Sequence, residues 1–152
     1  MTRKEDAEFY FANAFNCSQA VLTTFGKEMG FTEDQCLKIG CAFGSGMARQ
    51  QLTCGAVTGA LMVIGLLYGR GLNDDISKKE YTFEKTNEFF MEFQKKHGSI
   101  VCKELLQGLN MNDPDDLKKI KELDLFQTSC VKYVQDAVGI IERISGFKAD
   151  IG

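Results

Sequence analysis

The chain has little of several residue types, and each shortage narrows what it can be. Its 152 residues include one proline, one histidine and no tryptophan, so few rigid turns are expected. Lys and Arg total 18 against 21 for Asp and Glu. There is no positive excess to bind phosphates, and no aromatic and basic motif that would stack RNA bases. We therefore expect no nucleic-acid partner.

Long apolar runs are also missing. The most apolar segment, Ala56 to Tyr68, has 13 residues and lies between Arg49 and Arg70. A membrane span needs about 20 residues, so this segment is predicted to be a buried helix without membrane insertion. The first 15 residues lack the apolar core of a signal peptide, and we expect a cytoplasmic protein.

The predicted buried helix contains glycines spaced four residues apart, at Gly55 and Gly59 and again at Gly65 and Gly69. Glycine inside a helix costs about 1 kcal/mol relative to alanine, so a compensating contact is expected. Such pairs allow another helix, or a bound group, to come close. Gly55 and Gly59 are thus candidates either for packing or for access to a site.

Few segments alternate with a period of two, and helix start signals dominate. We predict one domain over residues 1–152, an all-α compact bundle of about seven helices around the buried glycine-containing helix. Capping residues mark the predicted starts. They are Thr2, Asn16, Thr32, Thr53, Ser77, Ser99, Asp113 and Thr128. Thr32 with Gln35 has the spacing of a capping box.

Six cysteines are present, but none forms a C-x-x-C pair, which excludes a sequence-local zinc ribbon or thioredoxin motif. Cys17, Cys54, Cys102 and Cys130 each follow a predicted cap within three residues. The unpaired N–H groups and partial charge of a helix start favour thiolate and lower the pKa of a cysteine. Four thiols at helix starts therefore indicate redox or metal chemistry.

A structural interpretation stands beside this one, because free cysteine is among the most buried residue types and packs as a small hydrophobe. Lys103 and Lys132 directly follow two of the four cysteines and could strengthen thiolate formation. Cys36 falls deeper in its helix and Cys41 lies near glycines, so the role of both stays open.

Other tempting features have simpler explanations. The glycine-rich segment 40–47 lacks the preceding strand that a dinucleotide site needs. His97 is expected to end a helix, and a Cys-His dyad would depend on it alone. Asp74 and Asp75, like the acidic residues at 113–116, are predicted to cap helices.

The run Asn16-Cys17-Ser18-Gln19-Ala20-Val21, the hexad Cys54-Gly55-Ala56-Val57-Thr58-Gly59 and the later lone cysteines at 102 and 130 resemble the C_GCAxxG_C_C family of redox-active proteins. The resemblance covers nearly the whole chain. It implies that Cys17, Cys54, Cys102 and Cys130 act together in redox chemistry, and it names no substrate.

Three functions follow from these residues. The first is an oxidoreductase that exchanges thiols and disulfides or transfers electrons. Its partner would be a redox protein or a small thiol or disulfide, and Cys54 is the preferred nucleophile. In the second, the same four cysteines bind zinc or an iron–sulfur cluster. The third is a non-catalytic helical interaction protein, in which the glycine pairs could form a homodimer. In the first and third cases no cofactor is needed.

Overall fold

The computed structural model describes residues 1–147, and over this range the fold is all-α, as predicted. The β pairing in this range is one isolated bridge between Thr53 and Val101. The helical elements are α1 (Arg3–Ala12), α2 (Cys17–Gly26), the 3₁₀ turn η1 (Lys27–Met29), α3 (Glu33–Gly40), the 3₁₀ turn η2 (Cys41–Phe43), α4 (Gly44–Met47), α5 (Gly55–Tyr68), α6 (Ser77–His97), α7 (Cys102–Leu105), α8 (Pro114–Glu122), the π turn η3 (Phe126–Cys130) and α9 (Val131–Ser145).

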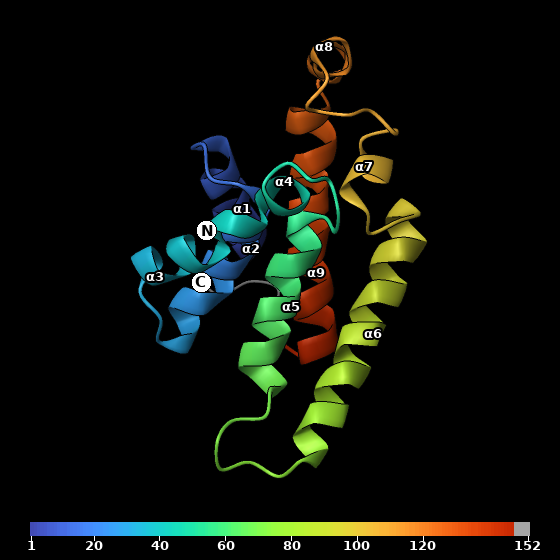
Figure 1. Ribbon diagram of the computed structural model, residues 1–152. Coiled ribbons are helices and arrows are strands. Elements are labelled where there is room, and N and C mark those ends of the chain that lie inside the picture. Colours follow the sequence, from blue (N-terminus) through green and yellow to red (C-terminus); the bar gives the residue numbers. More distant parts are fainter. Residues whose placement is uncertain (148–152) are drawn as a thin grey trace.

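The buried helix α5 lies at the centre of the bundle beside α9, with α6 on one side and α1 to α3 on the other (Figure 1). Side chains from these elements form one large apolar core. Its largest fully buried members are Phe25, Ile64, Phe89, Phe93, Ile140 and Ile141. A smaller cluster around Leu106, Met111 and Ile120 lies where α7 and α8 meet the start of α9. Within residues 1–147, no helix has both the length and the apolar character to cross a membrane.

Local capping explains four helix starts as the sequence predicted. Thr2 with Glu5, Asn16 with Gln19, and Thr32 with Gln35 each form a reciprocal capping box. The carboxylate of Asp113 accepts the backbone N–H of Asp116, and Pro114 opens α8. These side chains satisfy N–H groups that have no partner within the helix.

The caps predicted at Thr53, Ser77, Ser99 and Thr128 are wrong. Ser77 does not cap α6, because Asp75 accepts the N–H of Ser77 itself. Ser99 does not cap α7, because its hydroxyl accepts the N–H of Val101 before that helix starts. Thr53 is in the extended bridge, so α5 begins one residue later than a Thr53 cap would allow. Thr128 lies inside η3 and donates to the carbonyl of Asp124.

Two glycines of α5 allow close packing against α2. A Cβ at Gly59 would lie 2.8 Å from the carbonyl oxygen of Ser18, and one at Gly55 would lie 3.1 Å from the Cβ of Cys17. Gly65 is different, because nothing lies within 4 Å of the position of its Cβ. The first glycine pair is therefore used for helix contact within the chain.

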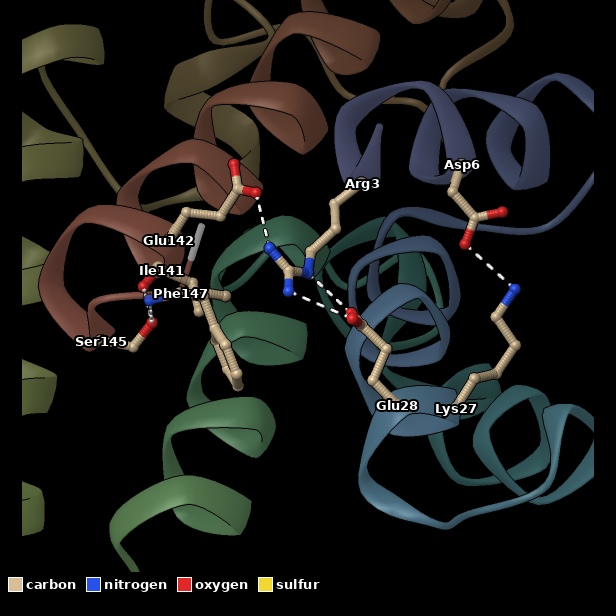
Figure 2. A network of polar contacts seen from close by, with 8 residues as sticks. All are labelled: Arg3, Asp6, Lys27, Glu28, Ile141, Glu142, Ser145 and Phe147. Carbon is tan, nitrogen blue, oxygen red and sulfur yellow. Dashed lines mark hydrogen bonds and ion pairs between the residues drawn. The ribbon is translucent and has the colours of Figure 1, made fainter. Parts of the chain in front are cut away.

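A buried arginine joins the two ends of the described chain (Figure 2). The guanidinium of Arg3 lies 2.6 Å from Glu28 and 2.8 Å from Glu142, and it stacks over the rings of Phe25 and Phe147. Arg3 and Glu142 are 4% and 6% exposed. Removing one member of such a group leaves a buried charge uncompensated, so this network fixes α1 against η1 and α9.

The glycine contacts lead to a matched pair of variants. Gly59→Ala should lower the free energy of unfolding by about 1–3 kcal/mol, because its Cβ would push α2 away from α5. Gly65→Ala should leave stability unchanged or raise it by up to about 1 kcal/mol through helix propensity. Urea unfolding followed by circular dichroism measures both. Equal effects of the two substitutions would contradict the packing role of Gly59.

Candidate functional site

The four predicted cysteines line one cavity of about 70 Å³ at the end of the bundle where α2, α5, α7 and η3 meet. In Figure 1 this is the upper end of α5, close to α4 and α7. The residues that line the cavity are Phe11, Asn16, Cys17, Ser45, Gly46, Cys54, Gly55, Cys102, Leu105, Leu106, Met111, Phe126, Cys130 and Tyr133. Four cysteines separated by up to 113 residues (130 − 17) in sequence are thus brought to one place.

Cys17 is placed by the capping box that starts α2. It is the first residue of that helix, and the side chain of Asn16 accepts the N–H of Gln19. The Asn16 amide also donates to the carbonyl of Cys41, and the Ser18 hydroxyl donates to the carbonyl of Gly40. The start of α2 is therefore tied to the end of α3, which holds Cys17 at the cavity wall.

Cys54 and Cys102 are placed by the short antiparallel pairing on either side of the Thr53–Val101 bridge. The N–H of Cys54 donates to the carbonyl of Ile100 at 2.8 Å, and the N–H of Cys102 donates to that of Leu52 at 2.6 Å. Cys54 is the N-cap residue of α5 and Cys102 is the first residue of α7. Two helices thus start side by side and turn both thiols into the cavity.

Cys130 does not lie in the first turn of a helix, which corrects the sequence prediction. It is the last residue of the π turn η3, and the chain already has helical geometry at Leu125. Because its N–H is not at a helix start, the partial charge that the prediction invoked does not explain its reactivity. Its surroundings do, as the pKa shifts show.

Burial dominates the protonation of two of the thiols. It raises the pKa of Cys54 to about 12, although the N–H groups of Ala56 and Val57 oppose the shift. Burial also raises the pKa of Cys102 to about 12. The N–H groups at the start of α5 thus act on the pKa of Cys54 in the expected direction, but burial outweighs them.

Cys17 and Cys130 both line the cavity and shift each other's pKa in opposite directions. The contact with Cys130, followed by burial, raises the pKa of Cys17 well above its usual value. The same contact lowers the pKa of Cys130, because the Cys17 thiol stabilises its thiolate. A charge on Cys130 also raises the pKa values of Cys54, Cys102 and Tyr133. Cys130 is thus the first of the four to ionise and the one whose charge reaches all the others.

One wall of the cavity is a left-handed turn that the sequence did not reveal. Residues 45–49 all have positive φ, between 54° and 70°, and Ser45 and Gly46 face the cavity. Each non-glycine residue in this conformation costs roughly 1–2 kcal/mol. Only a glycine fits at position 46, because a Cβ there would lie 2.6 Å from the Cα of Gln51.

The buried side chain of Gln51 holds this turn in place. Its amide nitrogen donates to the carbonyl of Leu109, and its amide oxygen accepts the N–H of Met111, both at 2.8 Å. The N–H of Leu52 returns to the carbonyl of Gly46. Strained backbone persists where its surroundings fix it, and it gathers at functional sites. In the sequence, Gly44 and Gly46 were the residues that could have indicated this left-handed turn.

Other candidates lie outside the cavity. Cys36 is buried against Gly26 in the core, and Cys41 is exposed beside α3. His97 lies 2.9 Å from the carboxylate of Asp136 and packs on the rings of Phe93 and Tyr133, as its predicted structural role requires. Burial lowers the pKa of His97. Asp75 accepts the N–H of Ser77 at the start of α6, as predicted, whereas Asp74 accepts the N–H of Gly71 in the preceding turn instead of capping a helix.

The thiols were tested against the requirements of a metal centre. Among residues 1–147, no three side chains of His, Cys, Asp or Glu are placed so that they could hold one metal ion. The arrangement therefore does not fit a four-cysteine zinc or iron–sulfur site.

A family model described as "Putative redox-active protein (C_GCAxxG_C_C)" matches residues 15–144, a range that contains the whole cavity except Phe11. The chain belongs to this family, whose name describes its members as redox-active. No curated protein and no solved structure matches the chain.

The pKa shifts predict an order of reactivity toward iodoacetamide, which modifies thiolates. Among the four cavity cysteines, Cys130 should be alkylated first, with a midpoint below that of an ordinary cysteine. Cys17→Ala should raise this midpoint, because it removes the neighbouring thiol that lowers the pKa of Cys130. Peptide mass spectrometry after timed alkylation between pH 6 and pH 10 measures both. Preferential alkylation of Cys54 would contradict this order.

Buried neutral thiols also make stability depend on pH. Because the pKa of Cys54 is about 12 in the folded chain and near 9 in an unfolded one, its contribution is complete below pH 9 and is lost as pH rises toward 12. In this window Cys54→Ala should make the loss of unfolding free energy less steep by about 1.4 kcal/mol per pH unit. Urea unfolding between pH 8 and pH 10.5 measures the slope. Cys41→Ala, which changes an exposed thiol, is the matched control.

Proposed function

We propose that this protein is a thiol–disulfide redox protein in which Cys17 and Cys130 alternate between two thiols and one disulfide. The shared cavity of these two cysteines and the opposite shifts of their pKa values carry the proposal. One of the two has a lowered pKa and can attack, while the other keeps its proton and can resolve. This division of roles is what a two-cysteine exchange reaction requires.

The reaction balances without a bound cofactor. The thiolate of Cys130 attacks one sulfur of an oxidised disulfide, forms a mixed disulfide and releases a thiolate. That thiolate takes the proton of Cys17, and the new Cys17 thiolate attacks the Cys130 sulfur and releases a second thiolate, which takes a proton from water. One external disulfide is reduced to two thiols while Cys17 and Cys130 are oxidised, and the reverse sequence reduces them again.

The other two cysteines would serve this pair without attacking first. Cys54 and Cys102 keep their protons and lie within electrostatic reach of Cys130. Once Cys130 has formed a bond and lost its negative charge, Cys54 or Cys102 can attack its sulfur in a later exchange and take over the disulfide bond. We therefore propose Cys130 as the nucleophile in place of Cys54, because burial raises the pKa of the Cys54 thiol. A cytoplasmic location would keep the resting protein in its four-thiol state.

Thiol counting tests the proposal. Mild oxidation by an excess of small disulfide should remove two thiols reversibly from the native protein. Cys130→Ser and Cys17→Ser should each abolish this intramolecular loss, whereas Cys41→Ser should leave it intact. The measurement is titration with a chromogenic thiol reagent, with mass spectrometry to locate the bond.

Two results would contradict the proposed pair. One is a disulfide that persists in Cys17→Ser but disappears in Cys54→Ser. The other is protein purified without oxygen that carries one equivalent of zinc or iron and whose four cavity thiols stay unreactive until unfolding. The second result would support the metal-binding alternative instead.

A further inference from the structure

We propose that the molecule which reacts in the cysteine cavity is a small, uncharged disulfide, and that the cavity discriminates against charged ones. This inference rests on the proposed function and concerns its substrate class. It depends on three properties of the cavity: the chemistry of its lining, the cost of placing charge inside it, and its size.

The lining has no charged side chain among the described residues. Apart from the cysteines, it consists mainly of apolar and aromatic groups, namely Phe11, Leu105, Leu106, Met111, Phe126 and Tyr133. Two of its polar groups already have partners: the Tyr133 hydroxyl donates to the carbonyl of Leu105, and the Asn16 amide is used at the start of α2. Ser45 adds a hydroxyl, which is neutral. A carboxylate would find no ion-pair partner there, and an ammonium group would find only the thiolate of Cys130.

Charge inside this cavity is penalised by burial. The cavity already keeps Cys54 and Cys102 in their neutral forms, and the same loss of water would act on a charged substituent of a substrate. A negative substituent would also be repelled by the thiolate of Cys130 that must attack. A positive one would be attracted by that thiolate but would still lose its water. The expected order is therefore neutral first, cationic second and anionic last.

The nearby lysines do not change this order. Lys103 and Lys132 directly follow Cys102 and Cys130, but both are exposed and neither lines the cavity. Their charges are on the water side of the wall, where they are screened. The volume of about 70 Å³ adds a limit on size, since it admits a small molecule rather than a bulky one.

The chemical step is the attack already described, with the substrate specified. The Cys130 thiolate forms a bond to one sulfur of the neutral disulfide, and the bond between the two substrate sulfurs breaks. Cys17 then gives its proton to the departing thiolate and closes the protein disulfide, which releases the second substrate half as a thiolate that takes a proton from water. Two electrons pass from the protein pair to the substrate, and no charge other than that of the thiolate enters the cavity.

Three disulfides of similar size separate the effect of charge. They are bis(2-hydroxyethyl) disulfide, which is neutral, cystamine, a dication, and 3,3′-dithiodipropionate, a dianion. Rates of protein oxidation at pH 7.5 are divided by the rate of each reagent with free 2-mercaptoethanol, which removes intrinsic reactivity. We expect the neutral reagent to exceed the dianion by about tenfold or more, which corresponds to about 1.4 kcal/mol, and to exceed the dication severalfold.

A charged wall should shift the order. Met111 is 8% exposed and lines the cavity, so Met111→Lys should raise the normalised rate of the dianion relative to the neutral reagent. Met91→Lys, at a methionine of α6 that is 71% exposed, is the matched control and should keep the native order. Met111→Gln adds polarity without charge and should also keep it.

The outcomes separate the two proposals. If none of the three reagents oxidises a thiol pair, the proposed function fails. If all three oxidise Cys17 and Cys130 but the dianion equals or exceeds the neutral reagent, only the substrate inference is overturned. The native protein alone decides this point, so the test stands even if Met111→Lys does not fold.

Discussion

The contact between α2 and α5 is the constraint on which the site depends. Two glycines remove the side chains that would separate these helices, so the backbone of Ser18 lies against Gly59 and the Cβ of Cys17 lies against Gly55. The glycine whose neighbour is Cys54 is therefore the one that touches Cys17. A single packing interaction aligns two cysteines from distant parts of the chain, and the family hexad is explained by packing as much as by chemistry.

Electrostatics then makes the four thiols unequal. Burial would keep all of them neutral, and a cluster of neutral thiols is stable but unreactive. The interaction between Cys17 and Cys130 breaks this equivalence, because it raises the pKa of Cys17 and lowers that of Cys130. Among the described residues, no histidine and no charged side chain lines the cavity, so this difference arises from the cysteines themselves.

Local interactions were readable in the sequence, and tertiary ones were not. The capping boxes at Asn16 and Thr32 depend on residues three apart, so the starts of α2 and α3 could be predicted. The position of Cys130 could not, because no residue type signals a π turn and Thr128 resembles an ordinary cap. The left-handed turn depends on hydrogen bonds between the side chain of Gln51 and the backbone of Leu109 and Met111, which are distant in sequence. The direction of the pKa shift at Cys54 depends on burial, which spacing along the chain does not show.

The π turn has a consequence for how this protein can change. A π turn contains one residue more than an α turn, so it rotates the preceding residues by about 100° relative to an uninterrupted helix. Cys130 is the last residue of the turn and leads directly into α9, so the rotation separates the register of α9 from that of the residues before the turn, such as Leu125. Deleting one residue from the turn would bring these preceding residues into the register of α9 and would turn Leu125 away from its present neighbours.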